Sequence, residues 1–144
     1  MKNICICSSV TFYEQVVTLS IELEKKGFAV SIPALASLMK KSKNFDLLSY
    51  QEKFNSDDHT RKGQLISDGF KNIERSDFII VANYEKHSQQ GYIGPNVLME
   101  IAIAFYLHKK IFLLFEVPAT ASYAAEVSGM GASILDANFD ALRQ

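Results

Sequence analysis

The chain has 144 residues, of which 48% are hydrophobic and 22% are charged, and its formal net charge is −1. This composition excludes a disordered chain, because there is enough apolar surface to bury a core. The near-neutral charge argues against a nucleic acid polymer as the main partner, since phosphate-backbone binders carry a basic face. We therefore predict one domain that spans residues 1–144.

The chain shows no apolar run of the length, about 18 residues, that a membrane-spanning helix needs. Its first residues lack the length and cleavage pattern of a signal peptide. We expect a cytoplasmic protein with no membrane partner, and we interpret Cys5 and Cys7 as buried reduced thiols. The three histidines have no metal-ligand spacing, so we predict neither a metal nor another cofactor.

The first half of the chain predicts two strands around one helix. A short apolar run at 3–7 is a buried strand, and the apolar spacing over 13–26 predicts a helix that ends before Gly27. A second strand follows at 28–32. The signal over 34–58 is weak, and a segment of this length in a small domain often serves as a lid or a binding loop.

The second half continues the alternation of helices and strands. Apolar residues at spacings of three and four predict helices, and short apolar runs predict buried strands. A polar loop at 83–95 separates the third strand from the next helix. The predicted elements are a helix at 59–75, a strand at 78–82, a helix at 96–108, a strand at 111–115, a helix at 119–128 and a strand at 132–135.

Apolar strands that alternate with helices are typical of a parallel sheet with helices on both faces. Five such strands predict an α/β fold, a flavodoxin-like doubly wound sheet with strand order 2-1-3-4-5. Ligands of these sheets bind beyond the carboxyl ends of the strands, where strands one and three meet. The polar residues that we expect to converge there are Ser8, Ser9, Asn83, Gly91, Gly94, Asn96 and Glu100. Asp77 precedes the third strand, so we place it at the opposite end and interpret it as structural.

Glu100 is a carboxylate among apolar neighbours, and we place it in the first turn of its helix. One explanation is structural, because the helix dipole favours an acid in the first turn. The other is functional, since a carboxylate that is ionised and partly desolvated is a good nucleophile toward an electron-poor carbon. Gly91 and Gly94 also have two interpretations: they turn the chain, or they let backbone N–H groups approach a sugar or phosphate. Ser8 and Ser9 are either turn residues or ligands of the same groups.

Three segments together resemble the nucleoside 2-deoxyribosyltransferase-like proteins, whose relatives include the 2'-deoxynucleoside 5'-phosphate N-hydrolases. They are "ICICSSVTFYEQVVTLSIELEKKGFAVSIP", "ERSDFIIVAN" and "GYIGPNVLMEIAIAFYLHKKIFLL". The resemblance implies that Glu100 attacks the anomeric carbon of a 2'-deoxynucleoside or its 5'-monophosphate. A covalent deoxyribosyl–enzyme would form, and a second base or water would accept the sugar. It also implies a homo-oligomer.

The resemblance also suggests roles around Glu100. Asn96 would orient Glu100 or the 3'-hydroxyl, and Phe12 or Tyr13 would stack on the base. Where the family carries a second acid, this sequence has Gly69, and the nearest acid is Asp68, which we predict as the other catalytic residue. A shift of one residue rotates a helical side chain by about 100°. The predicted substrate-binding residues are Ser8, Ser9, Phe12, Asn83, Gly91, Tyr92, Gly94 and Asn96.

Two other functions stay open at this point. A non-catalytic binder of a nucleotide derivative is compatible with the missing second acid. A phosphoribohydrolase of the kind that activates cytokinins also has a glycine-rich loop before a helix that bears a glutamate. The "GPNVLME" segment, Gly94–Glu100, fits that pattern less well, because it lacks the Gly-Gly-x-Gly-Thr loop.

Overall fold

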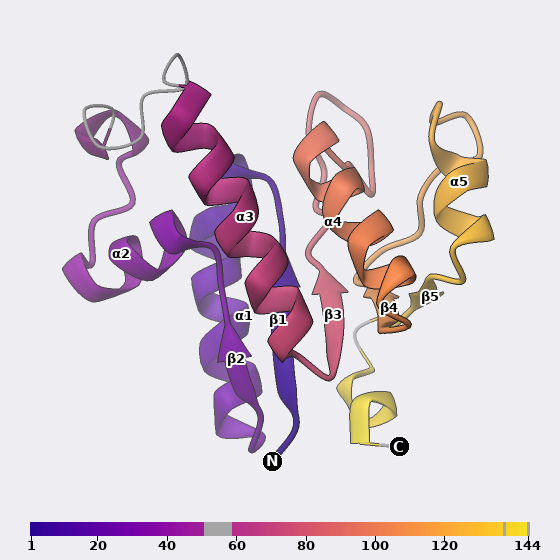
Figure 1. The fold of residues 1–144 in the computed structure, drawn as a ribbon, viewed down its shortest axis with the longest axis horizontal. Coiled ribbons are helices and arrows are strands. Elements are labelled where there is room, and N and C mark those ends of the chain that lie inside the picture. Colours follow the sequence, from indigo (N-terminus) through magenta and orange to yellow (C-terminus); the bar gives the residue numbers. More distant parts are fainter. Residues whose placement is uncertain (51–58, 137, 144) are drawn as a thin grey trace.

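A computed structural model describes residues 1–50, 59–136 and 138–143, so the last part of the predicted lid segment lies outside the described residues. Its five strands form one parallel sheet in the order β2-β1-β3-β4-β5 (Figure 1), which confirms the predicted flavodoxin-like topology. The strands are β1 (Asn3–Cys7), β2 (Ala29–Ser31), β3 (Phe78–Val81), β4 (Lys110–Leu113) and β5 (Ser133–Ile134).

Helices cover both faces of this sheet (Figure 1). Most lie close to their predicted positions, although the predicted helix at 119–128 forms only at its end. The helices are α1 (Tyr13–Lys25), α2 (Ala34–Ser42), α3 (His59–Arg75), α4 (Pro95–Tyr106) and α5 (Ala124–Gly129). Short 3₁₀ segments are η1 (Val10–Phe12), η2 (Leu47–Tyr50) and η3 (Phe139–Arg143).

Alternate residues of each central strand enter two different cores, as the period of two in a strand requires. In β1, Ile4 and Ile6 pack in the core on the α1 side. Cys5 and Cys7 face the other way, into the core that also contains Ile101 of α4. Both cysteines are free and buried.

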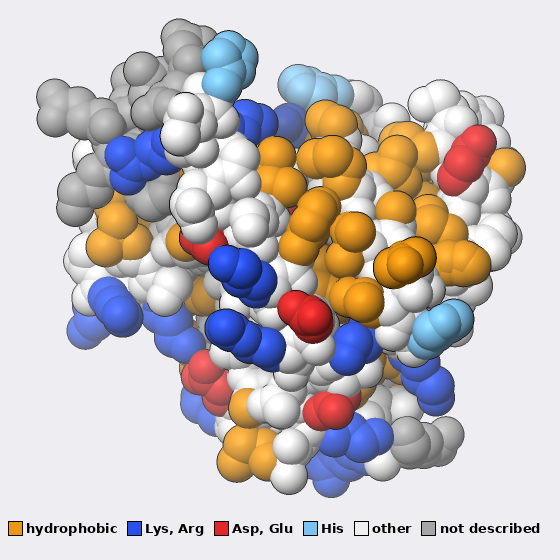
Figure 2. All heavy atoms as spheres, viewed as in Figure 1, with side chains coloured by type: hydrophobic (Ala, Val, Ile, Leu, Met, Phe, Trp, Pro, Cys, Tyr) orange, Lys and Arg blue, Asp and Glu red, His pale blue; other side chains and the backbone are white. Residues whose placement is uncertain are grey.

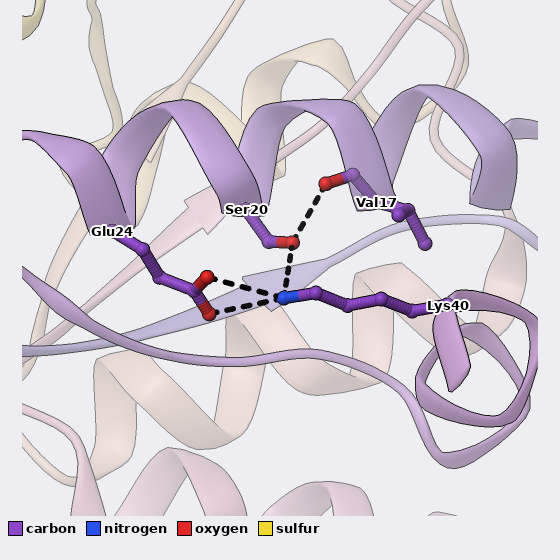
Figure 3. A network of polar contacts seen from close by, with 4 residues as sticks. All are labelled: Val17, Ser20, Glu24 and Lys40. Atoms are coloured by element: carbon purple, nitrogen blue, oxygen red, sulfur yellow. Dashed lines mark hydrogen bonds and ion pairs between the residues drawn. The ribbon is translucent and has the colours of Figure 1, made fainter.

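The described part of the weakly predicted segment contains α2 and η2. Leu35, Met39 and Tyr50 form a small hydrophobic cluster of their own. A polar network joins α2 to α1 (Figure 3): Lys40 Nζ lies 3.1 Å from Glu24 Oε1 and donates to Ser20 Oγ at 3.4 Å. These contacts join the last turn of α2 to the second half of α1.

The outer face of α4 is apolar. Hydrophobic side chains gather over α4 and α5 in Figure 2, and Met99, Phe105 and Tyr106 are 41%, 44% and 77% exposed. The homo-oligomer implied by the resemblance stays a prediction. Within the described ranges, no helix combines the length and hydropathy that crossing a bilayer would require.

Asp77 lies at the amino end of the sheet, away from the carboxyl ends of the strands. Its Oδ2 accepts a hydrogen bond of 2.7 Å from the Asn3 N–H, and its own N–H donates to Asn3 O at 2.8 Å. These two bonds extend the contact between β1 and β3 by one residue pair. The structural interpretation of Asp77 is therefore confirmed.

Candidate active site

A cleft of about 1080 Å³ opens at the carboxyl end of β1. One wall is formed by the first turns of α4 and by α3, and the opposite wall by the β2–α2 connection and η2. Its size is at the upper end of the range for pockets that bind small molecules, which is about 300–1,000 Å³. The cleft lies at the switch point that the strand order predicts.

Glu100 lies in the wall of this cleft and is only 8% exposed. The helix begins at Pro95, so Glu100 is in the second turn of α4, and its predicted place in the first turn is wrong. Asn96, one turn earlier, donates a long hydrogen bond from Nδ2 to Glu100 Oε1 at 3.4 Å. An orienting role for Asn96 is consistent with this contact.

Burial raises the pKa of the Glu100 carboxyl from its ordinary value of 4.5 to about 7. The direction follows from desolvation, which disfavours the charged form of an acid. The positive N-terminal end of α4, which would favour the ionised form, lies one turn before Glu100, and its effect falls off within the first turn of the helix. At neutral pH, protonated and ionised forms of Glu100 therefore coexist.

A phenol and a thiol lie within electrostatic range of Glu100. The pKa of Tyr13 is raised chiefly by burial, and further by the Glu100 charge. The pKa of Cys7 is raised first by its hydrogen bond with Cys5, then by burial and by Glu100. Both groups therefore stay neutral at physiological pH.

Ser9, Tyr92 and Gly94 form one compact part of the wall, at the N-terminus of α4. A Cβ atom at Gly94 would lie 3.0 Å from Ser9 Oγ and 3.7 Å from the Tyr92 hydroxyl oxygen. Lys86 Nζ lies 5.0 Å from the centre of the Tyr92 ring. Hydroxyl groups, a lysine and the positive end of a helix are suitable ligands for a phosphate.

Ser8 also lines the cleft, but the residue is only 4% exposed and its hydroxyl donates to Ala82 O at 2.7 Å. This bond joins the carboxyl ends of β1 and β3. A hydroxyl that is already committed to a buried backbone carbonyl is a poor ligand for a substrate. Ser8 therefore helps to join the two strands, and Ser9 is the more accessible of the two serines.

Three predicted substrate-binding residues do not line the cleft. Phe12 is 2% exposed and packs edge-to-face against the Tyr84 ring in the α1-side core. Asn83 is fully buried, and its amide donates to Phe115 O at 2.7 Å and accepts from Phe115 N at 3.0 Å. Gly91 has φ of +65°, and a Cβ atom there would lie 2.2 Å from Glu116 O. A side chain at Gly91 would clash with the backbone of Glu116, which explains why this residue is a glycine.

On α3, the residue that faces Glu100 is Gly69. A Cβ atom at Gly69 would lie 3.0 Å from Glu100 Oε2. Asp68 also lines the cleft, but its Oδ1 accepts a hydrogen bond of 2.9 Å from Gln64 Nε2, one turn back on the same helix. Gly69, the position where the resembling family carries a second acid, is thus the α3 residue beside Glu100, whereas the predicted catalytic residue Asp68 bonds along its own helix.

Several cleft residues were not predicted from the sequence. Lys62 of α3, Lys86 of the polar loop and Tyr50 of η2 all line the cleft. The signal for Tyr50 was weak, because the segment that contains it has no clear periodicity. The lysines carry no motif, so only their place in the lining of the cleft identifies them.

No protein-family model and no curated protein matches this sequence. Among solved structures, the CMP N-glycosidase BcmB of Clostridium botulinum is 16% identical, with a TM-score of 0.51, and the match covers 99% of this chain and 96% of that one. A 2-deoxyribosyltransferase of Bacillus psychrosaccharolyticus is 11% identical, with a TM-score of 0.57, covering 89% and 81%. The chain has the fold of these two proteins. At such identities, the likeness concerns the fold alone and confirms that part of the predicted resemblance.

Proposed function

We propose that this protein is an enzyme that breaks the N-glycosidic bond of a 2'-deoxynucleoside or its 5'-monophosphate. The observation that carries the proposal is the Glu100 carboxylate, buried in the wall of a cleft large enough for a nucleotide. The fold is shared with an enzyme named for CMP N-glycosidase activity and with a 2-deoxyribosyltransferase, which supports this class of chemistry.

In the proposed reaction, ionised Glu100 attacks the anomeric carbon of the sugar. The C–N bond breaks, its electron pair leaves with the base, and an ester joins the sugar to Glu100. Water or a second base then attacks the same carbon and releases the carboxylate. The transition state is like an oxocarbenium ion, and the neighbouring carboxylate stabilises its positive charge.

Polar groups near Glu100 are suited to hold the rest of the substrate. The Ser9 hydroxyl and the N-terminus of α4, with Gly94, would bind a sugar or phosphate oxygen. Asn96 would orient Glu100, and Tyr13 would stack on the base. A neutral base also needs a proton as it leaves, and Asp68 is the other carboxyl among the described residues of the lining.

A non-catalytic nucleotide binder is the second candidate. The observation that favours it is the raised pKa of Glu100, about 7, which leaves much of the carboxyl protonated at neutral pH. A protonated carboxyl donates a hydrogen bond but is not a nucleophile. Such a binder would gain about 2.7 kcal/mol of stability at 100 times the Kd, with no turnover.

The Glu100→Gln variant decides between the two functions. The amide keeps the shape of the side chain but cannot form the ester. We expect base release from a mixture of deoxynucleosides and deoxynucleotides, followed by chromatography, to fall at least about 10³-fold in the variant. Trapping of a sugar ester on Glu100 by mass spectrometry would identify the intermediate.

The control is Asp77→Asn, which lies at the opposite end of the sheet and should retain activity. Base release that persists in Glu100→Gln would contradict the proposed role of Glu100. If the wild-type protein binds these nucleotides in a thermal-shift assay and releases no base from any of them, the binder is correct and the enzyme proposal is wrong.

A further inference from the structure

The inference concerns the leaving group of the proposed reaction, and it rests on the proposed function. It starts from what surrounds Oε2 of Glu100. On the α3 side, the nearest residue is Gly69, whose missing Cβ would lie 3.0 Å from that oxygen. The cleft wall beside the reacting oxygen is therefore peptide backbone.

Among the residues that the structure describes, the other groups near Glu100 are poor proton donors. The pKa values of the Tyr13 phenol and the Cys7 thiol are both raised, so each holds its proton more tightly than in water. The Asp68 carboxylate accepts a hydrogen bond from Gln64 instead of facing Glu100. A neutral purine or pyrimidine leaves as an anion unless it is protonated, and a positioned acid typically contributes about 10²–10⁴-fold to such a step.

The same cleft is well suited to a positively charged ring. Tyr13, Tyr50 and Tyr92 line it, and tyrosine faces attract cations. The Tyr92 ring already holds a cation, since Lys86 Nζ lies 5.0 Å from its centre. Glu100 adds a negative charge where the sugar meets the base. Lys62 and Lys86 also line the cleft, and their ammonium groups are suited to contact a phosphate.

We propose that the preferred substrates are nucleotides whose base already carries a positive charge, such as N7-alkylated purine or N-alkylpyridinium nucleotides. When the C–N bond of such a nucleotide breaks, its electron pair neutralises the ring, and the base leaves without a proton. Glu100 forms the ester with the anomeric carbon. Water then cleaves the ester, returns the carboxylate and releases one proton to solvent.

A matched pair of substrates tests this proposal. 7-Methyl-2'-deoxyguanosine 5'-monophosphate and 2'-deoxyguanosine 5'-monophosphate share sugar, phosphate and ring, and differ by one methyl group and one charge. Base release is followed by chromatography and corrected for the uncatalysed reaction in buffer. We expect kcat/KM for the methylated nucleotide to be at least about 100-fold higher. The 2'-deoxy form of nicotinamide mononucleotide, with its pyridinium base, is expected to be cleaved as well.

Variants of the α3 residue separate the enzyme's contribution from the intrinsic lability of the methylated base. Gly69→Asp places a carboxyl beside Glu100, and Gly69→Ala adds only the Cβ. Relative to Gly69→Ala, we expect Gly69→Asp to raise kcat/KM for the unmethylated nucleotide at least about tenfold and to leave the methylated one unchanged or lower. Thermal melting checks that both variants fold, and the substrate pair decides in the wild-type protein if they do not.

The outcomes separate this inference from the proposed function. If any of the four common 2'-deoxynucleoside monophosphates is cleaved within tenfold of the methylated nucleotide, the inference is wrong and the proposed function stands. A loss of at least 100-fold toward those four in Asp68→Asn would show that Asp68 supplies a proton, and would also overturn it. No base release from any of these nucleotides would overturn both.

Discussion

The two walls of the cleft are built in different ways. The α4 wall, which carries Glu100, rests on the α4-side core through Val97, Ile101 and Ala104. The opposite wall, formed by α2 and η2, meets the α1-side core through Ala36 and has a separate small cluster, whose buried members among the described residues are Leu35, Met39 and Tyr50. The group proposed to react is thus on the wall that contributes several side chains to a main core, whereas the facing wall contributes Ala36 to such a core and otherwise relies on its small cluster.

Polar contacts compensate in part for the small cluster in the α2 wall. The Tyr50 hydroxyl donates to Asn44 O at 2.6 Å and shares a contact of 2.7 Å with the Ser42 hydroxyl. Lys40 reaches across to Glu24 and Ser20 on α1. Because polar contacts near solvent contribute little individually, this wall should open locally at lower free-energy cost than the α4 wall.

Truncation of one core residue in each wall should show the largest difference. We expect Ile101→Ala, at a fully buried position in the α4-side core, to lower the free energy of unfolding by about 3–5 kcal/mol. Leu35→Ala should cost about 2 kcal/mol, because the small cluster can collapse around the change. Urea denaturation measures both, and equal losses would contradict the proposed difference between the walls.

The charge of Glu100 should make stability depend on pH. Its pKa is about 7 in the folded protein and near 4.5 when unfolded, so the folded state binds more protons between these values. The free energy of unfolding contributed by this group is complete below pH 4.5 and is lost as pH rises through about 7. At about 1.4 kcal/mol for each pKa unit, the loss is about 3 kcal/mol.

Glu100→Gln removes this ionisation and provides the measurement. We expect the variant to gain stability over the wild-type protein as pH rises from 5 to 8, with the two curves converging below pH 4.5. Chemical denaturation across this range compares them. Parallel curves would show that the folded-state pKa of Glu100 is close to its ordinary value.

The smallest expected effect concerns the polar connection between α2 and α1. Lys40→Met should lower the free energy of unfolding by about 0.5–1 kcal/mol, because its partner Glu24 is partly exposed. If the α2 wall contacts substrate, KM should rise a few-fold while kcat stays unchanged. Lys41→Met, at an exposed neighbouring position, is the matched control and should change neither value. A fall in kcat alone would argue against this role of the network.

The sheet could be predicted because its central strands are short, continuous apolar runs, such as "FIIVA" (Phe78–Ala82), separated by helices. The place of Glu100 at the carboxyl edge followed from the strand order. Its predicted place in the first turn was wrong, because Glu100 is the sixth residue of α4, which begins at Pro95, a residue that we assigned to the loop. Proline at this position suits a helix start, since its missing N–H would have no partner there.

The rest of the site depends on contacts between distant residues. Asn83 was predicted at the cleft because it follows β3, yet its side chain turns toward Phe115, 32 residues later in the chain. The cleft wall at Tyr50 was missed because a small tertiary cluster, and no local periodicity, holds η2 in place. Local patterns do not reveal either contact.

The side chain of Asn83 makes the carboxyl end of the sheet sensitive to deamidation. Its amide makes the same paired bonds to Phe115 that another residue of β3 would make with its backbone. Deamidation to aspartate would replace the donating nitrogen with an oxygen that faces the Phe115 carbonyl, so two acceptors would meet in a dry environment. The bond from Asn83 to the Phe115 carbonyl, which joins the end of β3 to the segment after β4, would be lost. One chemical change at a residue that does not line the cleft would thus loosen the carboxyl end of the sheet.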